Sequence, residues 1–285
     1  MHAAVVGSPI AHSLSPVLHT AAYQELGLAD TWTYRAVECS VTELPAFLSA
    51  CAASPEPWAG LSVTMPLKRV ALDQAERASE LSRQVGGANT LVYRQGNWHA
   101  DNTDVGGIVS ALGEIGVRSV RSAVIVGAGA TGAAALAALR ALGATGDHAV
   151  RVVVRDPGRA QELERAAARM GATIDVRPMA DLAACLDRDG AGVDVVVSTV
   201  PAGAADTLAS TIAAANAAVL DVVYAPRPSV LAAAVTTAGG RVVDGFPMLL
   251  HQAALQVEQM TGCEQAPVEA MRAAGHAELR RRAAA

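Results

Sequence analysis

The sequence predicts an α/β protein of two domains, each built around a largely parallel sheet flanked by helices. Short apolar stretches of strand type alternate with helical stretches along the chain, and this alternation is typical of parallel sheets with helices on both faces. A glycine-rich turn follows one such strand only after about 120 residues, enough chain for a separate domain before it. The 285 residues are sufficient for two modest cores.

In the first hundred residues, runs of alternating or continuous apolar residues predict strands, and glycine or proline marks where they end. The expected strands are Ala3–Gly7, Thr31–Val37, Gly60–Val63 and a hairpin of Ala88–Arg94 with Asn97–Ala100, which turns at Gln95-Gly96. The expected helices are Pro16–Leu26, ended by Gly27, then Val41–Ala53, Lys68–Ala78 and Gly106–Leu112.

From residue 120 the alternation begins again. The expected strands are Val120–Val126, Val150–Val154, Val193–Ser198, Val219–Val223 and Arg241–Val243. The expected helices are Thr131–Leu142, Arg159–Met170, Val230–Ala238 and a final one at Met248–Thr261 that returns to the first domain, with Arg280–Arg282 as a solvated basic tail. We therefore expect one domain of residues 1–105 plus 246–285 and another of residues 106–245.

The glycine-rich turn is the most specific local feature. An apolar strand leads directly into Gly127-Ala128-Gly129-Ala130-Thr131-Gly132, and an Ala/Leu-rich helix follows. In this context the first glycine permits the tight turn, the second lets a pyrophosphate approach the backbone, and the third lets the helix pack on the strand. The free amides of the following helix offer an anion site. The second domain is therefore predicted to be a Rossmann-like dinucleotide-binding domain.

Composition argues against several classes of protein. A net charge of −5 and the lack of a basic, aromatic patch argue against nucleic-acid binding. No apolar run reaches the roughly 18 residues of a membrane-spanning helix, and the first residues do not have the pattern of a leader peptide, so none is expected. The four scattered cysteines predict neither a disulfide framework nor a metal site, so a cytoplasmic protein is expected. Nothing in the sequence decides between a monomer and a homodimer.

A segment with two serines follows the first expected strand. Ser13 and Ser15 are two residues apart, so both hydroxyls could face one small ligand from an extended loop. Ser15 precedes Pro16, however, and would equally suit the N-cap of a helix that has proline at its first position. The residues alone leave both interpretations open.

Three further polar segments lie at expected strand ends, where α/β proteins bind ligands. Thr64 and Lys68 lie in the turn after the third strand, Asn89 opens a strand, and Asp104 precedes a helix. Each has a structural alternative: a solvated lysine, a turn asparagine, an N-cap aspartate.

Taken together, these segments resemble shikimate dehydrogenases. The motifs that carry the resemblance occur in the family's order: Ser13–Pro16, Val63–Lys68, Gly87–Thr90 in slightly altered form, Asn102–Gly107, Gly127–Gly132 and Gln252–Ala254. The resemblance implies reversible, NADP-dependent reduction of 3-dehydroshikimate to shikimate, with Lys68 and Asp104 as the catalytic pair.

The resemblance also implies the binding residues. Those expected to contact the substrate are Ser13, Ser15, Ser62, Thr64, Asn89, Tyr224 and Gln252, with the first two near its carboxylate. Those expected to contact the cofactor are Gly127, Gly129, Ala130, Thr131, Gly132, Arg155, Arg159 and Thr199. No metal is implied. Ser62 replaces a usual asparagine, so its contact would weaken or use a water, and Pro247 replaces a glycine.

The chemistry of the reaction agrees with the catalytic pair. Hydride addition to a ketone creates an alkoxide, which a lysine ammonium can stabilise and protonate. A quinate or dual quinate/shikimate dehydrogenase is the alternative within the same class, and Ser62 leaves room for it. A non-catalytic sensor would be expected to lack Lys68 or Asp104, and a methylene-folate dehydrogenase would not explain the serine and Asn102–Asp104 motifs.

Cofactor choice is predicted at the end of the strand Val150–Val154. NAD enzymes carry a carboxylate there that binds the ribose, whereas this strand is followed by Arg155 and then Arg159, which could grip a 2′-phosphate. Asp156 would repel that phosphate unless it caps the next helix, as the following Pro157 suggests. NADP is therefore expected over NAD.

Overall fold

The computed structural model describes residues 1–187, 190 and 192–284. The chain forms two compact units, one of Met1–Thr103 with Leu250–Ala285 and one of Asp104–Leu249. Each is an α/β unit around a six-stranded sheet, which confirms the predicted fold class.

The first unit contains a mixed sheet in the order β2-β1-β3-β5-β6-β4. Its strands are β1 (His2–Gly7), β2 (Thr33–Glu38), β3 (Trp58–Val63), β4 (Arg77–Ala78), β5 (Thr90–Arg94) and β6 (Asn97–Asp101). Its helices are α1 (Ser15–Glu25), α2 (Leu44–Ala53), α3 (Lys68–Gln74), α4 (Glu80–Val85), the greater part of α11 (Gly245–Thr261) and α12 (Val268–Ala283). The predicted hairpin is confirmed: β5 runs antiparallel to both β3 and β6, while β1 is parallel to β2 and β3.

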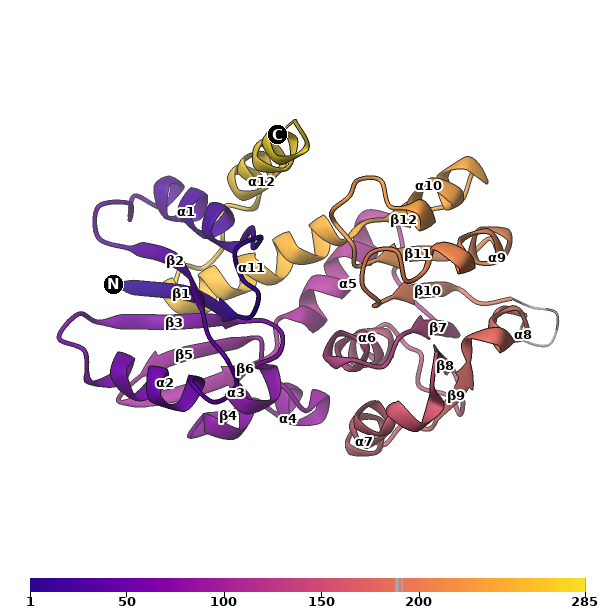
Figure 1. Ribbon diagram of the computed structural model, residues 1–285, viewed down its shortest axis with the longest axis horizontal. Coiled ribbons are helices and arrows are strands. Elements are labelled where there is room, and N and C mark those ends of the chain that lie inside the picture. Colours follow the sequence, from indigo (N-terminus) through magenta and orange to yellow (C-terminus); the bar gives the residue numbers. More distant parts are fainter. Residues whose placement is uncertain (188–189, 191, 285) are drawn as a thin grey trace. The chain divides into compact units, whose positions relative to one another are not determined.

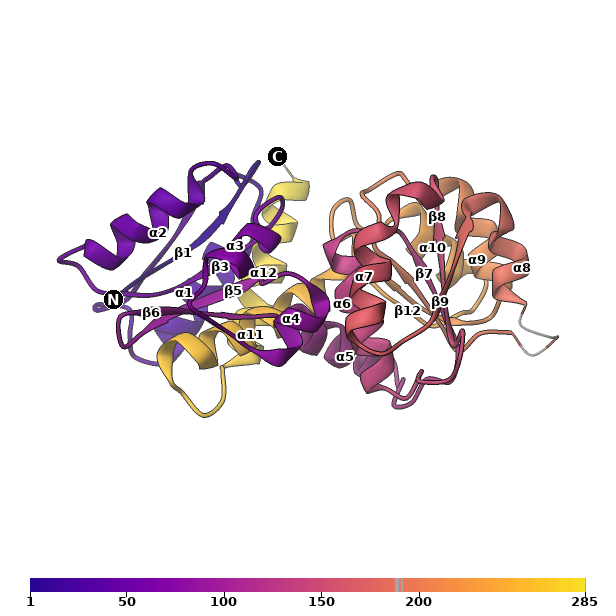
Figure 2. The same cartoon turned by 90° about the horizontal axis from the view of Figure 1, so that it is seen from below.

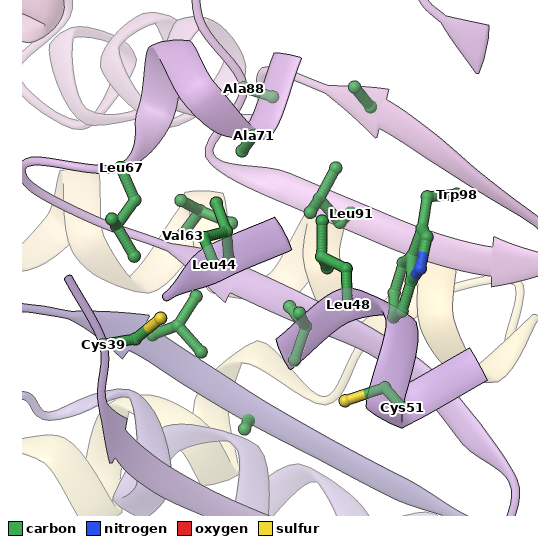
Figure 3. Close-up of a cluster of buried hydrophobic side chains, with 14 of the residues drawn as sticks. Cys39, Leu44, Leu48, Cys51, Val63, Leu67, Ala71, Ala88, Leu91 and Trp98 are labelled. Carbon is green, nitrogen blue, oxygen red and sulfur yellow. The ribbon is translucent and has the colours of Figure 1, made fainter. Parts of the chain in front are cut away.

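Helices cover both faces of this sheet because alternate strand residues point to opposite sides. Ala4 and Val6 of β1 pack with residues of α2 and α3 in one buried cluster, which Figure 3 shows around Leu48, Val63 and Leu91. Ala3 packs on the other side in a cluster with Met260 of α11. On the outside, α12 lies against α1 (Figure 1).

The second unit has an all-parallel sheet in the order β12-β11-β10-β7-β8-β9. Its strands are β7 (Ala123–Val126), β8 (Val150–Val154), β9 (Ile174–Pro178), β10 (Val195–Ser198), β11 (Ala218–Asp221) and β12 (Val242–Val243). Its α-helices are α5 (Asp104–Glu114), α6 (Ala130–Ala141), α7 (Gln161–Arg169), α8 (Leu182–Leu186), α9 (Ala209–Ala214) and α10 (Val230–Thr237). Figure 2 shows the strands of this sheet between α6 and α7 on one side and α8 to α10 on the other. The sheet and its two helical layers have the predicted Rossmann-like arrangement.

One predicted helix has the wrong bounds, and several elements of the structure were not predicted. The helix expected over 68–78 ends at Gln74, and Arg77–Ala78 instead forms β4, which pairs with His99–Ala100. The elements α4, β9, α8, α9 and α12 were not predicted, so Met248–Thr261 is not the final helix. Pro247 lies in the first turn of α11, where its missing N–H costs nothing. Within the described residues, no helix has both the length and the apolar character needed to cross a membrane.

Candidate active site

The polar segments predicted to bind a substrate lie together at one end of the strands of the first sheet, which we call its polar edge. β1 and β3 lie side by side and end at Gly7 and Val63. Because β5 runs in the opposite direction, its first residue, Thr90, pairs with Ser62 near the end of β3 and with Asp101 at the end of β6. The segments after β1, β3 and β6 therefore share an edge with the segment that precedes β5.

The serine segment leads from β1 into α1. Ser15 is the first residue of the helix and is 4% exposed, whereas Leu14 occupies the cap position without a side-chain hydrogen bond. The alternative in which Ser15 caps the helix is therefore wrong. The oxygen that accepts a backbone N–H here is Oγ of Ser13, 3.2 Å from the nitrogen of Ser15.

The C-terminal helix holds this segment from outside. The guanidinium of Arg282 donates to the backbone oxygens of His12, at 2.6 Å, and Ser13, at 3.3 Å. Glu278 accepts from Arg282 and Arg281, and these hydrogen bonds lower its pKa to about 2. Arg282 was expected in a solvated tail, and that expectation is wrong because its side chain binds the serine segment.

Backbone contacts fix the position of Lys68, the predicted proton donor. Lys68 is the first residue of α3 and is partly buried. Its carbonyl accepts the N–H of Ala88 at 2.8 Å, and a Cβ on Gly87 would lie 3.4 Å from its Cβ. The preceding turn is anchored as well, because the N–H of Thr64 donates to Val6 O of β1 at 2.9 Å. Lys68 and Thr64 thus lie at the polar edge, on a turn held by its neighbours.

A buried network of hydrogen-bonded amide and hydroxyl side chains lies at this polar edge. Asn89 Nδ2 donates to Thr103 Oγ1 at 2.9 Å and to Gln252 Oε1 at 3.1 Å, so both of its N–H groups are engaged. Its Oδ1 accepts from the backbone N–H of Thr103 at 2.7 Å and from the hydroxyl of Thr90 at 2.9 Å. All four residues are at least 94% buried. Asn89 therefore orients Gln252, which α11 brings into the first unit.

Ser62 is part of the same buried network. Its hydroxyl accepts from Tyr34 at 2.6 Å and donates to Gln256 Oε1 at 2.7 Å. A hydroxyl has one proton, and here that proton is directed at Gln256. In this arrangement Ser62 has no donor left for a substrate.

Two of the residues predicted for catalysis or substrate binding belong to the second unit. Asp104 is the first residue of α5 and is 5% exposed, within the first turn rather than before it. Tyr224 follows β11 in a segment tied down by Asp221, which accepts from Val223 N at 3.4 Å and from Ser229 Oγ at 2.6 Å. Burial raises the pKa of Asp221 above its usual value.

The glycine turn has the geometry that a pyrophosphate site needs. Gly127 has φ +103, which only glycine adopts readily, and Gly132 approaches Gly127 O so closely that a Cβ would lie 2.9 Å from it. Space next to Gly129 is open, and α6 begins at Ala130, followed by Thr131. These residues therefore form a tight turn with helix amides exposed behind it.

Beside this turn lies a cavity of about 580 Å³. Its lining includes Gly127, Gly129, Arg155 and Arg159 of the predicted cofactor residues. Asp156 Oδ1 accepts the N–H of Gly158 at 3.0 Å, so the predicted capping role of Asp156 is confirmed.

The predicted cofactor residue Thr199 has a structural role. Both its N–H and its hydroxyl donate to Val126 O at 2.9 Å, which joins the end of β10 to β7. A Cβ on Gly127 would lie 2.8 Å from Thr199 Oγ1. Thr199 therefore helps to shape the glycine turn from beneath.

Gln256, Tyr34 and Met179 are among the residues of these sites that escaped the sequence analysis. Gln256 lies four residues after Gln252, on the same helix face, so helical spacing could have identified it. Tyr34 meets Ser62 only through the packing of strands, which leaves no local signal. Met179 lines the cofactor cavity from a turn after β9, a strand that was itself not predicted.

Comparison with known proteins agrees with this geometry. Residues 5–91 match the family described as Shikimate dehydrogenase substrate binding domain, and residues 245–274 match Shikimate 5'-dehydrogenase C-terminal domain. Residues 122–224 match NADP oxidoreductase coenzyme F420-dependent. A shikimate dehydrogenase (NADP(+)) of Rhizobium rhizogenes is 37% identical over 96% of this chain and 93% of its own length.

Solved structures are similar over nearly the whole chain. The shikimate dehydrogenase of Mycobacterium tuberculosis has 45% identity and a TM-score of 0.85, with 97% of this chain and 99% of that chain covered. The enzyme of Thermus thermophilus, solved with NADP(H) and shikimate, has 30% identity and a TM-score of 0.80, with 97% and 98% covered. With its two α/β units, its polar strand edge and these full-length relatives, the chain belongs to the shikimate dehydrogenase family.

Proposed function

We propose that the protein catalyses the reversible, NADP-dependent interconversion of 3-dehydroshikimate and shikimate. The observation that carries the proposal is the edge of the first sheet, where the serine segment, Thr64, Lys68 and the Asn89–Gln252 pair come together. The printed names of the relatives, and the complex of the Thermus enzyme with NADP(H) and shikimate, support the same activity.

The two units would divide the work. The first, predicted as residues 1–105 plus 246–285, would bind the substrate through its polar edge. The second, predicted as residues 106–245, would bind NADP at the glycine turn, with Arg155 and Arg159 close to the 2′-phosphate. The geometry of Gly127 and Gly132 and the neighbouring cavity fit such a cofactor.

Proton transfer would be the task of Lys68 and Asp104. NADPH, when bound, supplies the hydride that reduces the ketone carbon. The ammonium of Lys68 would stabilise the negative charge that develops on the ketone oxygen and would donate the proton that completes the alcohol. The carboxylate of Asp104 would accept a hydrogen bond from the substrate hydroxyl.

The substrate's carboxylate would be bound by the hydroxyls of Ser13 and Ser15, and its ring hydroxyls by Thr64, Asn89 and Gln252. Tyr224 is proposed as a further contact of the substrate. Because Ser62 donates to Gln256, we propose that it supports these contacts through the network rather than as a strong direct donor.

We further propose a cytoplasmic location. All four cysteines are free thiols, and three of them are buried in the cores. Reduced, buried thiols suit a reducing compartment.

Initial rates with shikimate and with quinate, each with NADP and with NAD, test the proposed function. We expect shikimate with NADP to give the highest kcat/KM. A higher kcat/KM for quinate would overturn the choice of substrate, and no turnover of any combination would overturn the proposal as a whole.

A further inference from the structure

Gln256 is a buried amide that the proposed reaction does not use. It lies on α11, one helical turn after Gln252, and is 1% exposed. Its Nε2 donates to Asn89 O at 3.0 Å and to Thr90 Oγ1 at 3.1 Å. Its Oε1 accepts from the hydroxyl of Ser62 at 2.7 Å. One side chain of α11 thus contacts both the end of β3 and the start of β5.

Two backbone groups determine the orientation of the amides in this network. Asn89 O is a carbonyl and can only accept, so the atom of Gln256 that faces it must be Nε2. The backbone N–H of Thr103 can only donate, so the atom of Asn89 that faces it at 2.7 Å must be Oδ1. Asn89 Nδ2 is then the atom that faces Gln252, whose Oε1 accepts from it at 3.1 Å.

The hydroxyl of Thr90 connects Gln256 with Asn89. Because an amide N–H can only donate, the oxygen of Thr90 must accept from Gln256. The one proton of that hydroxyl is directed at Asn89 Oδ1, 2.9 Å away. The chain of donors therefore runs from Gln256 to Thr90, then to Asn89 and then to Gln252, and it begins and ends on α11.

We propose that Gln256 is a positioning residue of the substrate site, which holds the amide of Asn89 in the orientation observed here. The inference rests on the proposed function, in which Asn89 and Gln252 bind the ring hydroxyls of the substrate. Asn89 Oδ1 accepts from the N–H of Thr103 and from the hydroxyl of Thr90. Without Gln256, the hydroxyl of Thr90 can turn its proton to Thr103 Oγ1, 3.2 Å away, and Asn89 loses one of these donors. The amides of Asn89 and Gln252 are then held less firmly.

The substitution Gln256→Met tests this inference because it keeps the approximate size of the side chain and removes its polar end. Asn89 O still accepts the N–H of Val63 at 2.7 Å, so the fold should survive, which denaturant unfolding checks. We expect KM for shikimate to rise about threefold to tenfold, as for the net loss of one hydrogen bond, and KM for NADP to stay within about twofold. A role limited to filling space would leave both values unchanged.

Thr90→Val tests the same chain independently. Valine has the shape of threonine without the hydroxyl, so this variant removes the link between Gln256 and Asn89 and keeps both amides. We expect the same rise in KM for shikimate, and adding Gln256→Met to Thr90→Val should raise it by less than about twofold more.

Gln259→Met is the matched control. Gln259 lies on the same helix and donates to Asp101 Oδ2 at 2.7 Å, outside the chain of donors. The same substitution at this position should leave KM for shikimate unchanged.

An unchanged KM for shikimate in folded Gln256→Met or in Thr90→Val would overturn the inference. So would fully additive effects of these two substitutions, or an equal rise of KM in Gln259→Met. If Gln256→Met does not fold, the KM of Thr90→Val decides alone. In each case a wild type that oxidises shikimate leaves the proposed function intact. A wild type that neither binds nor oxidises shikimate would overturn the proposed function, and this inference with it.

Discussion

Replacing Arg155 with alanine should change cofactor preference without changing the chemistry. Arg155 is exposed directly after β8 and lines the 580 Å³ cavity together with Arg159 and the glycine turn. The neighbouring carboxylate of Asp156 accepts the N–H of Gly158 at 3.0 Å, so it is engaged by backbone rather than directed at a ribose phosphate. Arg155 is therefore the first cation after the strand that can meet a 2′-phosphate.

The magnitude follows from the type of bond. A hydrogen bond to a charged group contributes about 1.5–3 kcal/mol, and arginine can make two to one phosphate. Since about 1.4 kcal/mol is a factor of ten, Arg155→Ala should raise KM for NADP by roughly tenfold to a hundredfold. NAD lacks the 2′-phosphate, so its KM should stay within about twofold.

Steady-state kinetics with both cofactors at saturating shikimate measure this effect. Arg121→Ala is a suitable control, because Arg121 is an exposed arginine of the same unit that precedes β7, pairs with Asp194 and lies outside the cofactor cavity. Equal catalytic efficiency of the wild type with NADP and NAD would refute the reasoning. So would an Arg155→Ala variant whose KM for NADP is unchanged.

Three further predictions follow from particular contacts. Gly132→Ala would place a Cβ 2.9 Å from Gly127 O, so α6 must shift. The variant should lose about 1–3 kcal/mol of stability, measured by denaturant unfolding, and should bind NADP more weakly, measured by titration. Burial lowers the pKa of His19 from 6.5 to about 3. Below pH 6.5 the unfolded chain therefore binds a proton at His19 that the folded protein does not bind. The free energy of unfolding should then fall by up to about 1.4 kcal/mol for each pH unit. His19→Asn should flatten that slope, and an equally steep slope would contradict the assignment. Arg282→Ala frees the backbone of the serine segment, and KM for shikimate should rise severalfold while KM for NADP stays constant.

Local sequence signals were sufficient to predict the elements whose own residues determine their structure. The strand Val150–Val154 was predicted to the residue, because a run of β-branched side chains in a buried parallel strand has little alternative. The hairpin turn at Gln95-Gly96 was predicted as well, and both residues have positive φ, as a two-residue turn requires.

Elements that depend on distant partners were missed. β4 has two residues and exists only because His99–Ala100 pairs with it, so no local pattern reveals it. By contrast, α4 carries Ser79 as a capping side chain and a left-handed Gly86 at its end, and these signals could have revealed it.

The candidate site shows the same division. Lys68 and Asn89 lie beside strand ends that the sequence already indicated, and Gln252 reaches Asn89 from α11. The hydrogen bond between Ser62 and Tyr34 joins residues 28 positions apart, on different strands, and depends on the register of the sheet. That register cannot be predicted from a single sequence.

The turnover of Lys68→Ala tests the central claim most directly, with Arg69→Ala as its control. Arg69 is the next residue of α3, is exposed, and forms an ion pair with Asp73 one helical turn away. If Lys68 donates the proton, Lys68→Ala should lower kcat with shikimate and NADP by about 10² or more, as expected for loss of a general acid, while the variant keeps its fold and Arg69→Ala keeps wild-type turnover. A folded Lys68→Ala enzyme with wild-type kcat would contradict the account.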